Sequence, residues 1–401
     1  MHDDDRDLSQ PPSATTVTRT LSPRDVALYA VSVGADPVLH GDPDLRLVYE
    51  RHPRFAPLPA LAIVAAHDAI SLLGAAAMRE RVPGYAQERA LHGEHYVRLS
   101  RPLRAGGVYE TPAARPVRVT PKSGGDAAVV VLETETRRRK RRPGGRQAGG
   151  RQAAGGADAD AQAAGEVVAV NQFTSFVLGA ALGPAAREWT APGAERRPAA
   201  AVAANAPPAP ARPPDVSARL RVPTSAAALY RLNGDLNPLH VDPAAVPAGR
   251  FDGRPILHGL ATLGASLLLL ARAAGRDPLA AREVKCRFSS HVFPGDVLVV
   301  EGWRAAEGEG EGGGGRIVFR TMVERGAAAA AGRGAGARAG AEASALSAAA
   351  AGGATGERAA AISQAAVSFF SAEEMRWFEL EDAAEEGEQE APSAGASWSR
   401  L

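Results

Sequence analysis

A chain of 401 residues with 45% hydrophobic and 23% charged side chains is long enough for two or three folded units with a sizeable core. The formal net charge of +1 excludes a global electrostatic attraction to nucleic acid or to a membrane surface. The single cysteine excludes an internal disulfide and a multi-cysteine metal site, so Cys286 is expected to be a small core residue.

The first half of the chain offers one long apolar helix followed by strands. Residues 1–20 are acidic or polar and are expected to be disordered, without a secretory signal. Residues 58–78, interrupted by His67 and Asp68, predict a buried helix rather than a membrane span. Strand-like runs at 127–136 and 166–178 flank a low-complexity insertion at 137–165. These features predict an N-terminal unit over residues 21–190.

The insertion opens with six consecutive basic residues at positions 137–142. A nucleic-acid-binding patch often has aromatic residues between the basic ones, and this run has none. We expect a solvated loop, with a nuclear import or nucleic-acid patch as the alternative reading.

The second half repeats this organisation after an Ala/Pro-rich linker at 191–214. An apolar helix at 258–274 precedes strand-like runs at 316–324 and 359–370, which flank a second insertion at 326–357. This predicts a C-terminal unit over residues 215–378, followed by an acidic tail at 379–401.

The tail ends in Ser399-Arg400-Leu401, a conservative form of the Ser-Lys-Leu peroxisomal address. The expected location is therefore the peroxisome, and the expected protein partner is its import receptor. The sequence leaves the oligomeric state open, with a homodimer among the partners considered.

The two halves also resemble each other in sequence. Ala27-Leu28-Tyr29 leads to a Leu39-His40 pair, just as Ala228-Leu229-Tyr230 leads to Leu239-His240. Each half then has a long helix followed by strands joined through turns. We therefore predict an α+β fold in which two long helices are each wrapped by an antiparallel sheet.

The most informative segment is 230–242, which concentrates a carboxylate, an amide and an imidazole. Asp235, Asn237 and His240 stand in a loop, because Pro238 disfavours a helical residue before it. A carboxylate and an imidazole that share one water can transfer its proton, as addition of water to a double bond requires. Taken singly, Asp235 could be a turn cap and His240 a core histidine.

Metal binding is the rival interpretation of this segment. A calcium loop begins with the same Asp-x-Asn spacing, but His240 stands where glycine is needed and Val246 where glutamate is needed. His240, Asp242 and His258 could form a facial metal set, although no HExxH spacing supports it. We expect no metal.

A second motif, Pro255-Ile256-Leu257-His258-Gly259-Leu260, opens the apolar helix of the second half. The first N–H groups of a helix have no partner within it and can bind an anion. Gly259 would let a carbonyl approach the backbone closely.

Residues 230–240 closely resemble the signature of the hydratase 2 (MaoC-like dehydratase) family. The blocks Leu91-His92-Gly93-Glu94, Asn171-Gln172-Phe173 and 255–260 extend the resemblance over both halves. The resemblance implies a double hot-dog fold and the interconversion of trans-2-enoyl-CoA and (3R)-3-hydroxyacyl-CoA in peroxisomal fatty-acid β-oxidation. It implies no cofactor beyond the CoA of the substrate.

The resemblance also implies roles for individual residues. Asp235 and His240 would be catalytic, Asn237 would hold the water, and Gly259 would donate a backbone N–H to the thioester oxygen. The remaining residues would bind the acyl-CoA (His92, Gly93, Lys122, Gly234, Leu236, Pro238, Leu239, Phe288) or support the site (Tyr29, Glu50, Tyr230, Asp242, His258).

The first half is expected to be catalytically silent. Aligning His40 with His240 places Ala35 opposite Asp235 and Pro37 opposite Asn237, so no water-holding set is repeated there. Its helix would instead border the acyl chain. Two other functions stay open at this point: a hot-dog acyl-CoA thioesterase, and a non-catalytic acyl-CoA-binding scaffold.

Overall fold

The structure is a computed structural model that describes residues 16–86, 89–139, 165–191, 207–305, 315–325 and 358–390. Most of the two predicted insertions, most of the predicted linker, the basic residues 140–142 and the terminal tripeptide lie outside these ranges. The elements of the first half are β1 (Thr16–Thr20), α1 (Pro23–Ser32), α2 (Pro37–His40), α3 (Asp42–Val48), α4 (Leu61–Arg81), β2 (Ala90–Leu99), β3 (Val108–Pro112), β4 (Arg115–Lys122), η2 (Ser123–Gly125), β5 (Ala127–Arg138), β6 (Glu166–Leu178) and β7 (Trp189–Thr190).

The second half repeats this pattern of helices and strands. Its elements are β8 (Val216–Arg221), α7 (Ala226–Tyr230), η4 (Arg231–Asn233), η5 (Pro238–His240), η6 (Pro243–Ala245), η7 (Phe251–Gly253), α8 (Gly259–Ala273), η8 (Pro278–Ala280), β9 (Ala281–Phe288), β10 (Val297–Arg304), β11 (Arg316–Glu324), β12 (Ala359–Phe369) and α10 (Ala372–Glu390).

The two halves share one sheet of 12 strands. Its order, β1-β3-β5-β6-β2-β9-β12-β11-β10-β8, has the same connectivity on either side of the central β2–β9 pair, while β4 and β7 extend the first half beside β5. In the antiparallel central ladder His95 pairs with Cys286. The predicted duplication is therefore visible as a strand order, and backbone hydrogen bonds join the halves.

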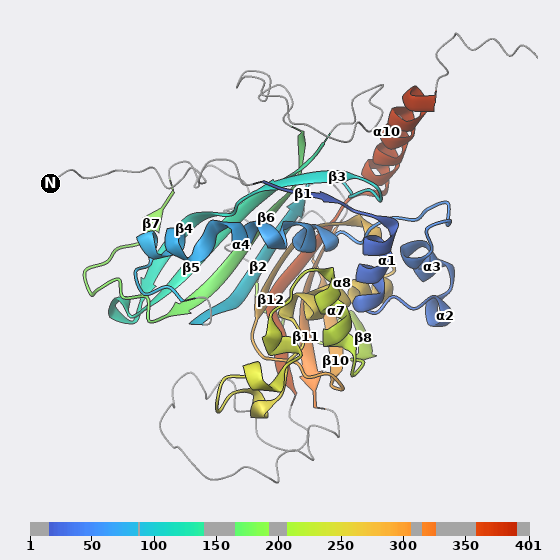
Figure 1. Cartoon of the computed structure of the whole chain (residues 1–401). Helices are drawn as coiled ribbons and strands as arrows, with labels where there is room; N and C mark the ends of the chain where they lie inside the picture. The colour runs from blue at the N-terminus through green and yellow to red at the C-terminus, as the bar shows by residue number, and fades with distance from the viewer. Residues whose placement is uncertain are drawn as a thin grey trace, which may run out of the picture.

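Each half wraps its sheet around one long helix, which confirms the predicted double hot-dog fold. Helix α4 lies across the strands of the first half and α8 lies against those of the second (Figure 1). Helix α8 is buried from Leu260 to Ala271, and its hydroxyls are satisfied locally: Ser266 Oγ donates to the Thr262 carbonyl at 2.6 Å. No described helix is long and apolar enough to cross a bilayer.

Side chains also tie the halves together. Helix α1 approaches α8 so closely that a Cβ at Gly264 would lie 2.7 Å from the hydroxyl oxygen of Tyr29. Nearby, Arg46 of the first half forms an ion pair of 2.6 Å with Asp277 of the second. Cys286 is fully buried and burial raises the pKa of its thiol to about 12, as expected for a core residue.

Two segments expected to lack structure are ordered. Thr16 to Thr20, within the predicted disordered N-terminus, form β1 and pair with β3. Their alternating β-branched residues favour a strand despite their polarity. Near the C-terminal end of the predicted linker, Trp303 Nε1 donates to the Arg212 carbonyl at 2.9 Å and fixes that segment to β10.

The acidic tail begins as a helix rather than as a flexible segment. Helix α10 continues to Glu390, and its acidic face contacts arginines of the first half. Arg101 is 2.7 Å from Asp382 and 3.1 Å from Glu381. The acidic composition suggested a solvated tail. The arginines that pair with it lie far away in the sequence, so no local pattern indicated these contacts.

Candidate active site

The segment 226–242 folds into a braced loop. Helix α7 ends at Tyr230, and Gly234 then adopts a φ of 133°, a conformation that side-chain-bearing residues rarely reach. Asp235 Oδ1 accepts from the Asn237 N–H at 3.2 Å, and Asn237 Oδ1 accepts from the Leu239 N–H at 3.1 Å. These two hydrogen bonds fix the loop, and neither of them uses Asp235 Oδ2.

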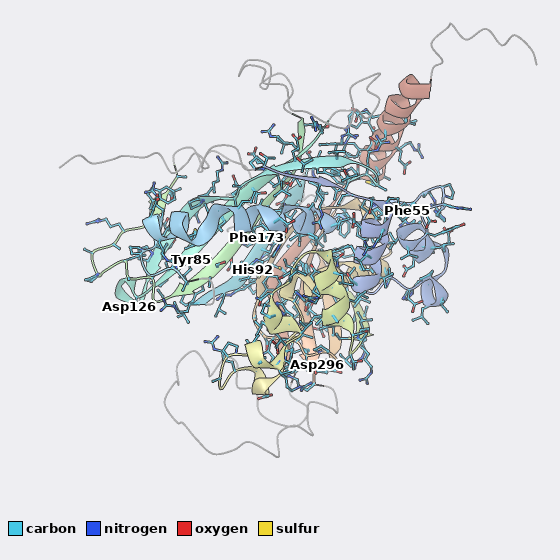
Figure 2. All side chains as sticks on the ribbon, viewed as in Figure 1. Phe55, Tyr85, His92, Asp126, Phe173 and Asp296 are labelled. Carbon is cyan, nitrogen blue, oxygen red and sulfur yellow. The ribbon has the colours of Figure 1, made fainter. Side chains whose placement is uncertain are left out.

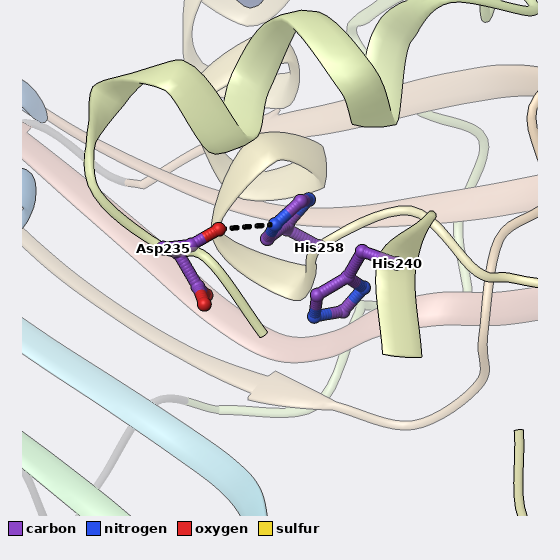
Figure 3. A group of neighbouring side chains, drawn as sticks. All are labelled: Asp235, His240 and His258. Carbon is purple, nitrogen blue, oxygen red and sulfur yellow. Dashed lines mark hydrogen bonds between the residues drawn. The ribbon is translucent and has the colours of Figure 1, made fainter. Parts of the chain in front are cut away.

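The loop brings together the carboxylate and imidazole that the sequence singled out. Ligand-type atoms of Asp235, His240 and His258 all lie within 4.8 Å of one another. Figure 3 shows the two imidazoles side by side, with their ring centroids 3.7 Å apart and their planes inclined by 25°. His258 Nε2 donates to the backbone carbonyl of Asp235 at 3.2 Å and so ties the loop to the start of α8.

The hydrogen bonds of His240 determine which of its nitrogens can accept a proton. Its Nδ1 lies 2.8 Å from the carbonyl oxygen of Ile256, and a carbonyl can only accept. Nδ1 therefore carries the hydrogen, and Nε2 offers its lone pair in the neutral ring. Burial lowers the pKa of His240 below its usual value of 6.5, although the Ile256 carbonyl and the charge of Asp235 oppose this shift.

This shift predicts the pH dependence of any reaction in which His240 accepts a proton. The neutral imidazole would be the active form, so kcat/KM should stay level above pH 6.5 and fall only as the pH drops through the lowered pKa of His240. Measuring kcat/KM from pH 4.5 to 8.5 checks this expectation. A midpoint of the acid limb at or above pH 6.5 would contradict the proposed environment of His240.

His258 is a buried neutral partner in this cluster. Burial, followed by the nearby His240, lowers the pKa of His258 to about 4. Its Nδ1 is buried and has no hydrogen-bond partner among the described residues. Tyr230 packs beside it, with the ring centroids 4.9 Å apart.

The cluster of possible metal ligands in the structure differs in one residue from the set considered from the sequence. Asp242 caps η6 by accepting from the Ala244 N–H at 2.8 Å, and it is absent from the three-residue cluster that the described residues form. Asp235 takes its place beside His240 and His258. His240 Nδ1 and His258 Nε2 already donate to carbonyls. Each imidazole therefore has only one nitrogen left that could bind a metal ion.

The N-terminus of α8 faces the same region. Leu257 is anchored by its N–H, which donates to the Val292 carbonyl at 2.7 Å, and Thr262 N–H makes the first bond within the helix, to the His258 carbonyl at 3.1 Å. No bond from the N–H of Gly259 is found among the described residues. A Cβ at Gly259 would lie 3.2 Å from the Phe288 ring, so Phe288 packs closely beside the first residue of α8.

The first half contributes aromatic residues across the central strand pair. His92 packs against Phe288 at 5.1 Å and against Phe173 at 5.6 Å between ring centroids. His92 and Phe173 lie together near the centre of the molecule (Figure 2). Next to them, Gly93 occupies a register shift between β2 and β6. Burial lowers the pKa of His92 to about 4, and its Nε2 is buried without a partner in the described part of the chain.

Other predicted residues lie further from the cluster or on its rim. Lys122 is exposed at the end of β4, three strands across the sheet from His92. Glu50 lies on an exposed turn after α3. Tyr29 is buried, and its ring centroid lies 6.2 Å from that of Tyr230. Leu236 is 60% exposed, and Pro238 also lies at the surface.

Sequence reasoning missed three residues that hold the loop in place. Arg19 of β1 donates to the carbonyls of Val64 and Asn233, each at 3.0 Å. Asn233 in turn donates to Ser32 Oγ at 3.0 Å. His67 of α4 places its Nε2 3.7 Å from Asp235 Oδ2. The polar His67 within an apolar helix was the only sequence signal for any of them.

Comparison with known proteins places both halves in related families. A model described as "MaoC like domain" matches residues 205–321, and one described as "MFE-2 hydratase 2 N-terminal domain" matches residues 20–143. The 3-hydroxyacyl-thioester dehydratase Y of Mycobacterium tuberculosis is 33% identical over 306 residues, which cover 75% of this chain and 85% of that protein.

Longer proteins match as well. The peroxisomal multifunctional enzyme type 2 of Mus musculus is 32% identical over 299 residues, 74% of this chain but 33% of that enzyme, so the chain spans only about a third of its length. The solved structure of the full-length Drosophila melanogaster enzyme of the same name aligns with a TM-score of 0.57 and 26% identity, covering 88% of this chain and 48% of that one.

Proposed function

Because the chain belongs to the MaoC-like hydratase 2 family of hydro-lyases, we propose that it adds water reversibly to trans-2-enoyl-CoA and forms (3R)-3-hydroxyacyl-CoA. The observation that carries this proposal is the position of Asp235 and the free Nε2 of His240 close to the N-terminus of α8. A water-activating pair and a set of N–H donors are the two elements that this hydration needs.

The proton transfers of the proposed reaction follow from these groups. The attacking water donates its hydrogens to the Asp235 carboxylate and to His240 Nε2, which orient its oxygen toward Cβ. As the C–O bond forms, the pair takes one proton from the water and delivers it to Cα. The electron pair of the double bond passes first to the thioester oxygen and then to the new Cα–H bond, so no other reactant is required.

The start of α8 stabilises the enolate that forms between these steps. The N–H of Gly259 donates to the thioester oxygen, and the helix dipole adds a favourable potential for negative charge there. Asn237 helps to hold the attacking water by donating from its Nδ2, since its Oδ1 already caps η5. His92 and Phe288 flank the thioester, while Lys122 and the loop residues Gly234, Leu236, Pro238 and Leu239 contact the remainder of the acyl-CoA.

An assay with crotonyl-CoA tests the proposal against the thioesterase alternative. Hydration should remove the absorbance of the conjugated enoyl thioester without release of a free thiol. Free CoA formed at the rate at which the absorbance disappears would instead identify a thioesterase. Binding of crotonyl-CoA without either change would support a scaffold.

We further propose that the protein acts in peroxisomal fatty-acid β-oxidation. The support is the peroxisomal designation of the mouse and fly relatives and the predicted address Ser399-Arg400-Leu401. Deleting this tripeptide from the chain tagged at its N-terminus should move the protein from peroxisomes to the cytosol, as seen by fluorescence microscopy. Unchanged peroxisomal targeting would refute the role of the tripeptide.

A further inference from the structure

The carboxylate of Asp235 has its two oxygens in different surroundings. Oδ1 accepts a hydrogen bond from the Asn237 N–H within the loop. Oδ2 faces His67 of α4, whose Nε2 is 3.7 Å away. That separation is within ion-pair range and slightly too long for a hydrogen bond. The first half of the chain, which lacks its own water-holding set, therefore reaches the carboxylate of the second half with one side chain.

The approach of His67 to Asp235 is held in place from both sides. Arg19 donates to the Val64 carbonyl of α4 and to the Asn233 carbonyl of the loop that carries Asp235, each at 3.0 Å. Val64 lies three residues before His67, on the same face of the helix. The guanidinium is planar and rigid, so it fixes the spacing between the helix and the loop.

The side chains of His67 and Asp235 are 28% and 22% exposed, so both are partly shielded from water. Burial is the main cause of the lowered pKa values of His92 and His258, and the proximity of His67 adds to the lowering of each. His67 therefore interacts electrostatically with several residues of the cluster. An ion pair fully exposed to water would have little effect on the pKa values of its neighbours.

We propose that His67 is a positioning residue of the active site, which directs Asp235 Oδ2 toward the water and makes the site a composite of both halves. This inference rests on the proposed hydratase function. His67 Nε2 donates to Oδ2 once the substrate closes the site, while Oδ1 keeps its bond to the loop. The carboxylate is then held at both ends, and its remaining lone pairs point at the water.

Two pairs of substitutions test this role in the full-length protein. His67→Leu removes the donor, and we expect kcat for crotonyl-CoA to fall about 10- to 100-fold with little change in KM, the range supported by a hydrogen bond to a charged partner. His67→Gln keeps an N–H donor at similar reach and should retain most of the activity. His67→Asn is polar but too short to reach Asp235, so it should behave like His67→Leu even if the leucine variant folds poorly.

A matched control uses another histidine in an ion pair of the same half. His52 lies 2.9 Å from Asp42, whose side chain is 58% exposed, and His52→Gln should leave kcat unchanged. In an Asp235→Asn background, His67→Leu should have no further effect on the residual rate. An equal loss of rate in both backgrounds would contradict positioning through Asp235.

The outcomes separate this inference from the function on which it rests. A wild-type chain that does not hydrate crotonyl-CoA would overturn the proposed function itself. A wild-type chain that hydrates it, together with His67→Leu and His67→Asn variants of normal kcat, would overturn the role of His67 alone.

Discussion

Replacing Asp235 or His240 with alanine should lower kcat/KM for trans-2-enoyl-CoA by about 10³-fold, within the range usual for loss of a general acid or base. Each change removes one of the two acceptors that hold the water, and neither side chain forms part of the apolar core. The fold and the affinity for acyl-CoA should therefore persist. Steady-state kinetics, with binding of saturated butyryl-CoA as a second measurement, checks both expectations.

Conservative variants sharpen this first experiment. Asp235→Asn keeps the oxygen that braces Asn237 but removes the charge, and His240→Gln keeps a polar group without a basic imidazole. Both should be nearly as slow as the alanine variants if proton transfer is the lost function. Because the two residues act on the same water, the double variant should be little slower than either single one. Near wild-type turnover by any single variant would refute the assignment.

The second large effect concerns the N–H of Gly259. Gly259→Pro deletes this donor while leaving a helix start intact, because proline is favoured at the first position of a helix. The residue before it, His258, already has φ −57° and ψ 134°, which a following proline permits. We expect kcat to fall about 10²- to 10³-fold, as for removal of one oxyanion-hole donor.

Gly259→Ala is the matched control for this experiment. Both substitutions add a Cβ that would lie 3.2 Å from the Phe288 ring, but alanine keeps the N–H. The alanine variant should therefore lose much less activity than the proline variant, with circular dichroism confirming that both are folded. Equal losses in the two variants would show that crowding against Phe288, rather than the missing donor, lowers the rate.

Local patterns made the fold and the core of the site predictable. The long apolar runs became α4 and α8, and the repeated strand-like runs became β5, β6, β11 and β12. Asp235 and His240 are close in sequence, so a proline-containing loop was enough to predict that they meet. The start of α8 at Gly259 likewise followed from a local change from a polar to an apolar pattern.

What the sequence did not reveal depends on contacts between distant segments. His67 and Asp235 are far apart in the chain and meet because the β2–β9 pair and side-chain contacts such as those of Arg19 join the two halves. The order of β1 depends on its pairing with β3, and the helical start of the acidic tail on the arginines that it contacts. Periodicity describes one element at a time and cannot predict such pairings.

The structure also refines the comparison between the two copies of the motif. Helix α2 begins at Pro37 with Asp36 as its cap, and η5 begins at Pro238 with Asn237 as its cap. This equivalence places Asp36 opposite Asn237 and Gly34 opposite Asp235, one residue away from the alignment based on His40. The first copy still has no carboxylate at the position of Asp235, so its proposed contribution to the reaction comes from α4 instead.

The configuration of the product tests the account most directly. Crotonyl-CoA incubated with the purified full-length protein should yield 3-hydroxybutyryl-CoA that is almost entirely the 3R enantiomer on chiral chromatography, and the Asp235→Asn variant should yield almost none. A 3S product would contradict the proposed 3R hydration. A racemic product, or equal product formation by the variant, would contradict hydration at a single centre formed by Asp235 and His240.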